Sequence, residues 1–240
     1  MAGTLEAGGT TTAIAISPDG ARLAVGTAAG TIRVGTLGDR RSSDLDAPGG
    51  GARSIAFSSS GDLLVAGLED GTVAAWSTLD RRRLYRRLEH RRGSPVRSVA
   101  FSAGDSRLVT AGRDSTVRVW NAATGQALYA LRGHFGSVGD AAFSANGQWV
   151  VSAGRLTVGL WDLASRQRLL FLAGHEGRVL AASFDPTGRT ITTVGVDGVR
   201  SYRCEVCGGV ADLLQRAERR LAATGRTLTA SERRRYLQDG

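Results

Sequence analysis

Apolar and polar residues alternate with a period of two along most of the chain, in short runs separated by turn-forming residues. The clearest stretch is 96–134, VRSVAFSAGDSRLVTAGRDSTVRVWNAATGQALYALRGH. Its alternating runs are interrupted by Ser, Gly, Asp and Asn, the residues that favour turns. The pattern predicts four short antiparallel strands, at 96–101, 107–112, 116–120 and 126–131.

The same unit recurs five times. An apolar residue followed by Ser or Asp and a turn stands at Ile16-Ser17, Phe57-Ser58, Phe101-Ser102, Phe143-Ser144 and Phe184-Asp185, at intervals of 41, 44, 42 and 41 residues. A period near 42 residues is typical of blade-type repeats. We therefore predict an all-β fold, a β-propeller of five four-stranded antiparallel blades.

The pattern divides the chain into a repeat domain, residues 1–207, and a tail, residues 208–240. The repeats lie at about 10–48, 49–90, 91–134, 135–175 and 176–207. The fifth repeat lacks a fourth strand of its own, and residues 2–7 resemble the end of such a strand. We predict that 2–7 closes the last blade, because closure removes exposed sheet edges. The alternative is an incomplete larger ring, with blades missing before Met1.

The tail departs from the repeat and has a helical pattern. Its apolar residues follow one helical stripe, at Val210, Leu213, Leu214, Ala217 and Leu221. Gly225 is placed to end this helix, and Thr229 to Glu232 form a capping box that begins a second one. We therefore predict a short α-helical tail.

The residues that end the repeats and their third strands resemble those of the WD-repeat family of β-propellers. Gly-His ends a repeat at Gly133-His134 and Gly174-His175, with Glu89-His90 as a variant, and Trp-Asp ends a third strand at Trp161-Asp162, with Trp120-Asn121 and Trp76-Ser77 as variants. A Ser-Pro-Asp-Gly turn stands at 17–20. The resemblance covers residues 1 to about 203 and implies a non-catalytic scaffold.

The resemblance also implies a hydrogen-bonded tetrad of His, Ser or Thr, Asp and Trp in each well-formed blade. The complete set would be His90, Thr110, Asp114 and Trp120. Incomplete sets would be His134, Ser152 and Trp161, without the Asp, and His175, Thr193 and Asp197, with Tyr202 in the Trp place. Because these residues recur at corresponding positions, we interpret them as structural and assign no catalytic residue.

All basic residues counted in the net charge are arginines. The 31 basic residues include no lysine, which excludes chemistry that needs an amine, and the net charge of +9 favours anionic surfaces. Seven arginines crowd into residues 81–92, at Arg81, Arg82, Arg83, Arg86, Arg87, Arg91 and Arg92. They could form a ridge that grips carboxylates or phosphates. The alternative is a solvated outer strand with Leu84, Tyr85 or Leu88 turned inward.

Cys204 and Cys207 are the only cysteines. One pair is too few for a structural zinc site, so we expect no metal and no cofactor, and interpret the pair as buried thiols or a labile disulfide. No apolar run is long enough to span a membrane and no signal peptide is evident. The expected location is the cytoplasm, without contact to a membrane.

The Cys pair, the helix and the segment Leu228-Thr229-Ala230-Ser231-Glu232-Arg233 resemble the end of the WD-repeat region of bacterial signal-transduction NTPases. No P-loop motif occurs in the chain. The functional hypothesis is therefore a non-enzymatic scaffold or sensor module in bacterial signalling that binds a protein partner and no small-molecule substrate. The alternative is an anion-binding module that uses the seven arginines to bind nucleic acid or an acidic protein.

Overall fold

The computed structural model describes residues 5–37, 42–47, 49–88, 90–204 and 207, and these residues form nineteen β-strands and no helix. In chain order the strands are β1 (Thr11–Ile16), β2 (Arg22–Thr27), β3 (Thr31–Thr36), β4 (Ser42–Asp46), β5 (Ala52–Phe57), β6 (Leu63–Leu68), β7 (Thr72–Ser77), β8 (Arg83–Leu88), β9 (Val96–Phe101), β10 (Arg107–Gly112), β11 (Thr116–Asn121), β12 (Ala127–Arg132), β13 (Asp140–Phe143), β14 (Trp149–Ala153), β15 (Val158–Asp162), β16 (Gln167–Leu172), β17 (Val179–Phe184), β18 (Thr190–Gly195) and β19 (Gly198–Arg203). The tail expected to be helical lies outside the described residues. No described helix has the length and hydrophobicity needed to cross a membrane.

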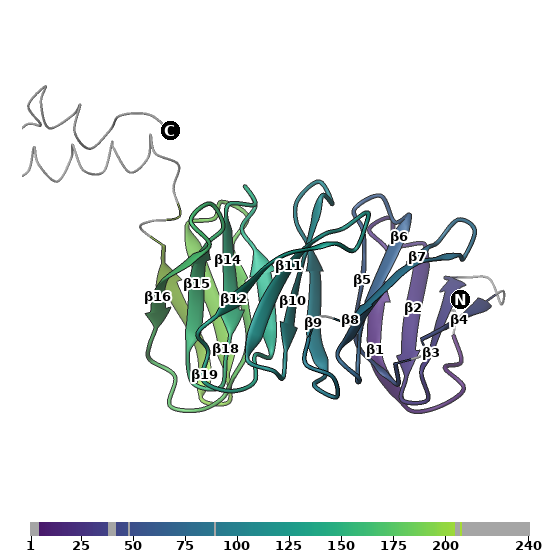
Figure 1. Ribbon diagram of the computed structural model, residues 1–240, viewed down its shortest axis with the longest axis horizontal. Helices are drawn as coiled ribbons and strands as arrows, with labels where there is room; N and C mark the ends of the chain where they lie inside the picture. The colour runs from purple at the N-terminus through teal and green to yellow at the C-terminus, as the bar shows by residue number, and fades with distance from the viewer. Residues whose placement is uncertain (1–4, 38–41, 48, 89, 205–206, 208–240) are drawn as a thin grey trace, which may run out of the picture.

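The strands assemble into five sheets, each built from strands that are consecutive in the chain. Four sheets have four strands, and the fifth, β17-β18-β19, has three among the described residues. All pairings are antiparallel, so the expected all-β fold with four-stranded antiparallel sheets is confirmed. We call the sheets blades 1 to 5 in chain order. Figure 1 shows them side by side, from the purple blade 1 to the green blade 5.

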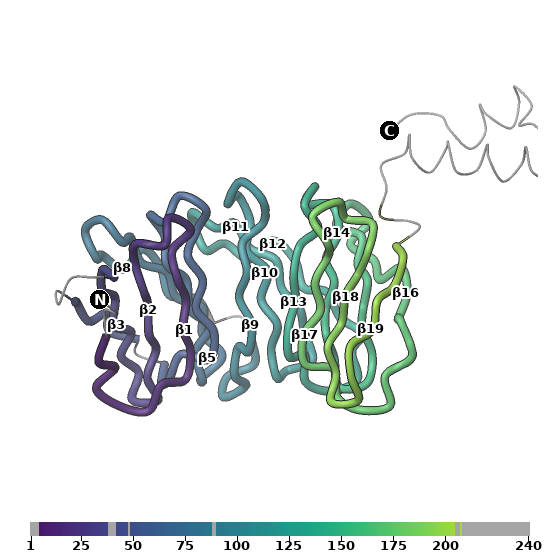
Figure 2. The backbone as a smooth tube through the Cα atoms, turned by 180° about the vertical axis from the view of Figure 1, so that it is seen from behind, coloured from purple at the N-terminus to yellow at the C-terminus, as the bar shows by residue number. Residues whose placement is uncertain are grey.

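Neighbouring blades meet through their first strands. Contacts join β1 to β5, β5 to β9, β9 to β13 and β13 to β17, and Figure 2 shows the same succession from behind. The first strand of each blade is therefore its innermost strand, and the fourth strand is the outermost.

The hydrophobic core lies between the blades. Each core cluster combines side chains of two successive blades, for example Ile32 and Leu45 of blade 1 with Ile55 and Leu64 of blade 2. Strands buried on both faces need apolar residues on both, which explains the largely apolar second and third strands. A tryptophan lies fully or almost fully buried at the end of the third strand in blades 2, 3 and 4, as Trp76, Trp120 and Trp161.

A tight turn joins the third and fourth strands, and it has to approach the preceding blade closely. In blade 3 this turn contains Gly125, whose φ of 67° lies in the left-handed region. A Cβ atom at Gly125 would come within 2.4 Å of the Tyr85 ring of blade 2. Glycine therefore allows the aromatic ring of one blade to pack under the turn of the next.

The two terminal blades each leave an apolar face uncovered. Ile14 of β1 and Ile55 of β5 occupy the same register position of their blades. Ile55 is 7% exposed because it packs against blade 1, whereas Ile14 is 63% exposed. At the other end, Val199 of blade 5 is 67% exposed, while its counterpart Ile32 in blade 1 is fully buried. In the described part of the chain, no neighbouring blade covers either face.

The described part of the N-terminal segment contacts blade 1. Residues 5–7, the described part of the expected closing strand, form no strand. Instead the Glu6 carbonyl accepts a hydrogen bond of 2.6 Å from Arg33 Nη1 of blade 1. Arg33 is fixed there by bonds to both carboxylate oxygens of Asp44, at 2.6 and 2.8 Å. Residues 5–7 thus lie at blade 1, whereas residues 2–4 lie outside the described residues, and closure of the last blade by 2–7 stays a prediction.

Candidate functional site

A buried group of four side chains joins blade 2 to blade 3. His90 Nε2 lies 2.8 Å from Thr110 Oγ1, and His90 Nδ1 lies 3.0 Å from Asp114 Oδ1. Trp120 Nε1 donates to Thr110 Oγ1 at 2.9 Å. The structure thus brings together the four residues expected to form the complete tetrad.

The hydrogen bonds of this tetrad run in one direction. An ionised Asp114 only accepts, so His90 Nδ1 carries a proton, and in the neutral ring Nε2 accepts from the Thr110 hydroxyl. Burial raises the pKa of Asp114, but hydrogen bonds from His90, the Arg91 backbone and Thr116 outweigh it and hold that pKa well below its usual range. The polar groups satisfy one another inside the protein, which is the arrangement of a structural element rather than of an open catalytic site.

The junction of blades 3 and 4 has the same arrangement without its acid. His134 Nε2 lies 2.7 Å from Ser152 Oγ, and Trp161 Nε1 donates to the same oxygen at 2.7 Å. His134 Nδ1 is buried and has no hydrogen-bond partner among the described residues. Burial, with a smaller effect of the Arg168 charge, lowers the pKa of His134 to about 4.

Blade 5 retains the acid but not the fourth hydrogen bond. His175 Nδ1 lies 2.6 Å from Asp197 Oδ1, and His175 Nε2 lies 2.8 Å from Thr193 Oγ1. Tyr202 occupies the strand position of the tryptophan, but its hydroxyl donates to the Ala173 carbonyl at 3.2 Å. Its expected place in the hydrogen-bonded group is therefore wrong, because a phenol extends farther from the strand than an indole N–H.

The seven arginines of residues 81–92 do not form one continuous ridge. Arg81 and Arg82 lie in the turn before β8, Arg83, Arg86 and Arg87 lie on β8, and Arg91 and Arg92 lie in the loop after it. A six-residue strand is about 20 Å long, so the two ends of this set cannot grip one small anion together. Two members are also engaged locally: Arg86 pairs with Asp70 at 2.7 Å and Arg82 with Asp80 at 3.5 Å.

The centre of β8 follows the alternative expectation of a solvated outer strand with an inward aromatic residue. Tyr85 is 6% exposed, and its hydroxyl donates to the Ala122 carbonyl of blade 3 at 2.9 Å. Burial raises the pKa of Tyr85. Arg83 and Arg87 are exposed, as suits an outermost strand.

Sequence reasoning missed a second group of arginines. They lie on the innermost strands of blades 2 and 3, in a turn of blade 3 and directly before the innermost strand of blade 5. Arg53 is on β5, Arg97 is on β9, Arg113 is in the turn between β10 and β11, and Arg178 directly precedes β17. Burial lowers the pKa of Arg97, and the positive charges of Arg178, Arg113 and Arg53 lower it further. We call these four residues the inner arginine cluster.

Two acids of the described residues lie beside the inner arginine cluster. Arg53 forms an ion pair with Glu69, whose charge also acts on the pKa of Arg97, and Asp140 accepts hydrogen bonds from Ser98 and the Ala182 backbone. The Nε atom of Arg97 is buried and has no hydrogen-bond partner within the described residues. The cluster is therefore an electropositive site built from strands and turns of three blades. Aligning the repeats by strand register would have indicated it, because Arg53 and Arg97 share one position on successive inner strands.

Cys204 and Cys207 form a disulfide, and both are 4% exposed. They belong to the core cluster between blades 4 and 5, which agrees with a structural interpretation. Among the described residues, no group of three or more His, Cys, Asp or Glu side chains is placed to hold a metal ion.

Comparison with known families matches the chain to the family model described as WD domain, G-beta repeat, at residues 41–77, 82–121, 125–162 and 166–199. Each match begins at the outermost strand of one blade and continues into the next blade; three matches run through its first three strands, and the match at 166–199 ends two residues into β19. No curated protein matches the chain. WD40 repeats generally mediate protein–protein interactions, and proteins built from them are typically non-enzymatic scaffolds. Since the four matches cover more than half of its residues, the chain belongs to the WD40 repeat family.

Proposed function

We propose that this chain is a non-catalytic scaffold that holds a protein partner through an acidic segment bound at the inner arginine cluster. The observation that carries the proposal is the gathering of four arginines from three blades, of which Arg113 and Arg178 are exposed and Arg97 has a buried Nε without a hydrogen-bond partner among the described residues. In agreement with this, burial and the charges of the other three arginines lower the pKa of Arg97. Such a surplus of positive charge is stabilised when carboxylates approach, because arginine binds them with two parallel hydrogen bonds.

The location of the cluster supports binding rather than stability. Arg113 and Arg178 are exposed and lie next to strand ends, Arg113 in the turn between β10 and β11 and Arg178 directly before the inner strand β17. Loops held by a rigid scaffold are common binding positions, and neighbouring blades of this array supply that rigidity. A partner that contacts the cluster would touch blades 2, 3 and 5 at once.

The first prediction tests this site with a fluorescein-labelled polyglutamate peptide. We expect Arg113→Gln/Arg178→Gln to weaken peptide binding by roughly tenfold at about 50 mM salt, since two charge-assisted contacts are lost. The matched control is Arg83→Gln/Arg87→Gln, which removes the same charge from the outer strand β8. Fluorescence anisotropy measures both affinities.

Equal weakening in the two double variants would contradict a specific site and leave only an effect of net charge. Greater weakening in the β8 variant would favour the second candidate function, an anion-binding outer strand. That candidate is supported by the exposure of Arg83 and Arg87. Repeating the titration at the same salt concentration with a single-stranded oligonucleotide of equal charge separates nucleic acid from an acidic protein as its ligand, because the matching ligand should bind more tightly.

The proposed biological setting is regulatory, with the repeat array acting as a sensor or scaffold in bacterial signalling. This part of the proposal rests on the resemblance of the C-terminal sequence, and residues 208–240 lie outside the described residues. Sequencing the gene upstream of Met1 tests it, since an adjoining NTPase domain would support the signalling role and a different effector would count against it.

A further inference from the structure

The side chain at one position of the fourth, outermost strand determines how fully the space between that blade and the next is filled. At the junction of blades 2 and 3 this position is Tyr85, whose ring packs under Gly125 and whose hydroxyl bonds to Ala122. At the junction of blades 3 and 4 it is Tyr129, and the Arg166 guanidinium lies 5.2 Å from the centre of its ring. A tyrosine on the outermost strand thus fills both junctions.

At the junction of blades 1 and 2 the same position holds a serine. Ser43 stands opposite the third strand of its blade in the register that Tyr85 and Tyr129 occupy in theirs. The missing ring leaves a cavity of about 220 Å³, room for about seven water molecules at roughly 30 Å³ each. We call it the junction pocket, and its described lining residues are Arg22, Val34, Gly35, Thr36, Ser42, Ser43, Thr78 and Arg81.

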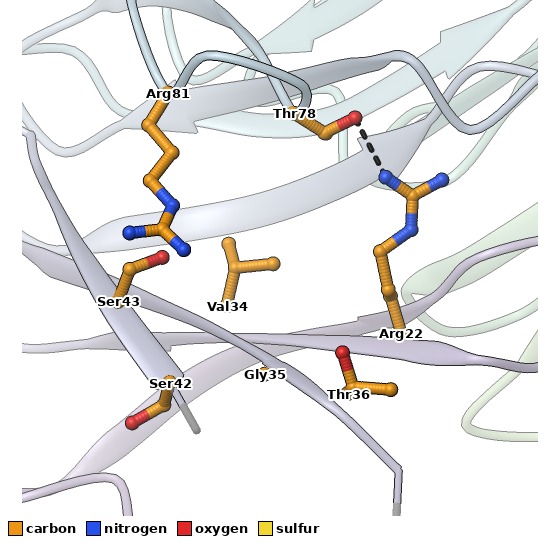
Figure 3. Close-up of a pocket in the computed structure, with 8 residues that line it drawn as sticks. All are labelled: Arg22, Val34, Gly35, Thr36, Ser42, Ser43, Thr78 and Arg81. Carbon is orange, nitrogen blue, oxygen red and sulfur yellow. Dashed lines mark hydrogen bonds between the residues drawn. The ribbon is translucent and has the colours of Figure 1, made fainter. Parts of the chain in front are cut away.

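The lining of the junction pocket carries two positive charges and no negative one among the described residues. Figure 3 shows the Arg22 and Arg81 side chains entering from opposite sides, with Val34 between them. The hydroxyl groups of Thr36, Ser42 and Ser43 add donors that can rotate toward a ligand.

Arg22 is held in position before any ligand arrives. Its Nη1 donates to Thr78 Oγ1 at 2.7 Å, and that hydroxyl donates onward to the Gly61 carbonyl at 2.7 Å. The guanidinium carbon also lies 5.9 Å from the ring centre of Phe57. Asp19 is close enough for the Arg22 charge to lower its pKa slightly, but its main hydrogen bonds are local, to Ser17 and the turn backbone.

Arg81 is directed by the turn on which it stands. Its φ of 60° matches that of Gly125 at 67° and Arg166 at 58°, the residues at the same turn position in blades 3 and 4. Arg166 stacks on a tyrosine, whereas Arg81 faces Ser43 and makes no ion pair with a described residue. Within the described part of the chain, no acidic side chain thus pairs with its charge, which faces the pocket.

A comparison within the molecule shows that an open junction alone does not make an anion site. At the junction of blades 4 and 5 the controlling position is Leu170, and a cavity of about 150 Å³ remains. Leu160, Leu172 and Ile191 line it, so that cavity is mainly apolar. The serine and the two arginines together distinguish the junction pocket.

We propose that the junction pocket binds a phosphoryl group, either as inorganic phosphate or as a small phosphate monoester. Two guanidinium groups from different blades, together with hydroxyl donors on several sides, suit the tetrahedral array of phosphate oxygens better than a planar carboxylate. The site is separate from the inner arginine cluster, because it lies at the outer strands, β3 and β4, and the turn before β8. It also gives a small-molecule ligand to a chain for which none was expected.

The experiment is isothermal titration of the full chain with inorganic phosphate and, separately, with methyl phosphate. We expect saturable binding of at least one ligand and a loss of about tenfold or more in affinity for Arg81→Gly. The matched control is Arg166→Gly, which removes the same charge from the same turn position, and we expect it to change affinity less than about twofold. The tighter of the two ligands indicates whether free phosphate or an ester is the natural one.

A second variant closes the pocket without removing charge. Ser43→Tyr restores the residue found at the two filled junctions, so we expect it to abolish phosphate binding and to preserve or raise the melting temperature. Arg81→Gly gives the answer if the tyrosine variant misfolds. Absence of binding up to about 10 mM of both ligands, equal losses in the Arg81 and Arg166 variants, or full binding by a folded Ser43→Tyr would each overturn the proposal.

Discussion

His134 differs from the other two histidines in one missing contact. His90 and His175 each have a carboxylate at Nδ1, whereas Nδ1 of His134 is buried without a partner in the described part of the chain. The turn of blade 4 is one residue shorter and carries Leu156 in the region where blade 3 has Asp114. A deletion at the surface has therefore left an unsatisfied group in the interior, which makes blade 4 sensitive to protonation.

The second prediction concerns pH. The pKa of His134 falls from 6.5 to about 4 on folding, so the unfolded chain takes up a proton more readily below pH 6.5. Stability should therefore decrease as the pH drops from about 6.5 to about 4 and then level off with respect to this group. Urea unfolding should show a loss of about 2 kcal/mol between pH 7 and pH 5. His134→Gln should remove most of that loss, and an unchanged pH dependence in the variant would refute the assignment.

The third prediction concerns the complete tetrad. Asp114→Ala should lower the free energy of unfolding by about 1–3 kcal/mol, because His90 Nδ1 and the Arg91 backbone N–H lose their acceptor. Leu156→Ala, in the corresponding turn of blade 4, is the control and should cost less than about 0.5 kcal/mol, since Leu156 is 52% exposed. Unchanged thermal stability of Asp114→Ala would rule out a structural role for the tetrad.

At the scale of the strands, the pairing within each blade can be predicted from its sequence. The contacts that its strands make with neighbouring blades cannot. The alternating pattern predicted the four strands of residues 96–134 because period-two alternation and turn residues are local signals. The widest repeat interval, 44 residues, adds its extra residues between His90 and β9, in a loop, and not in the arginine-rich strand β8. The sequence of a single repeat could not predict the inner arginine cluster. The cluster forms only because the innermost strands of different blades lie side by side, and this arrangement is not encoded within one repeat.

The fourth prediction compares one strand position in two blades. Ile55→Ala should destabilise the protein by about 2–4 kcal/mol, because the side chain is buried between blades 1 and 2. Ile14→Ala removes the same atoms at the equivalent position of blade 1 and should cost less than about 0.5 kcal/mol, because that side chain is 63% exposed. Urea unfolding of the two variants provides the comparison. Equal costs would mean that the face of blade 1 is covered in solution.

For the molecule as a whole, the repeats determine the number of sheets but not the closure of the array. Five similar units predicted five sheets, because each unit brings its own turns and core residues. Closure depends on the small rotation between successive blades, which side-chain packing sets and a hydrophobic pattern does not encode. The hydrogen bond from Arg33 to the Glu6 carbonyl, which lies at blade 1, is likewise a contact that the pattern does not predict.

The offset between repeats and sheets has a consequence for how such a chain can grow. Three of the four matched repeats supply the outermost strand of one blade and three strands of the next, as residues 82–121 do with β8 and β9 to β11. Duplicating that stretch of gene would insert a complete blade and leave every existing edge paired, whereas duplicating one sheet would insert a block without this overlap. The sequence repeat therefore does not coincide with the sheet, and a duplicated repeat would contribute strands to two adjacent blades.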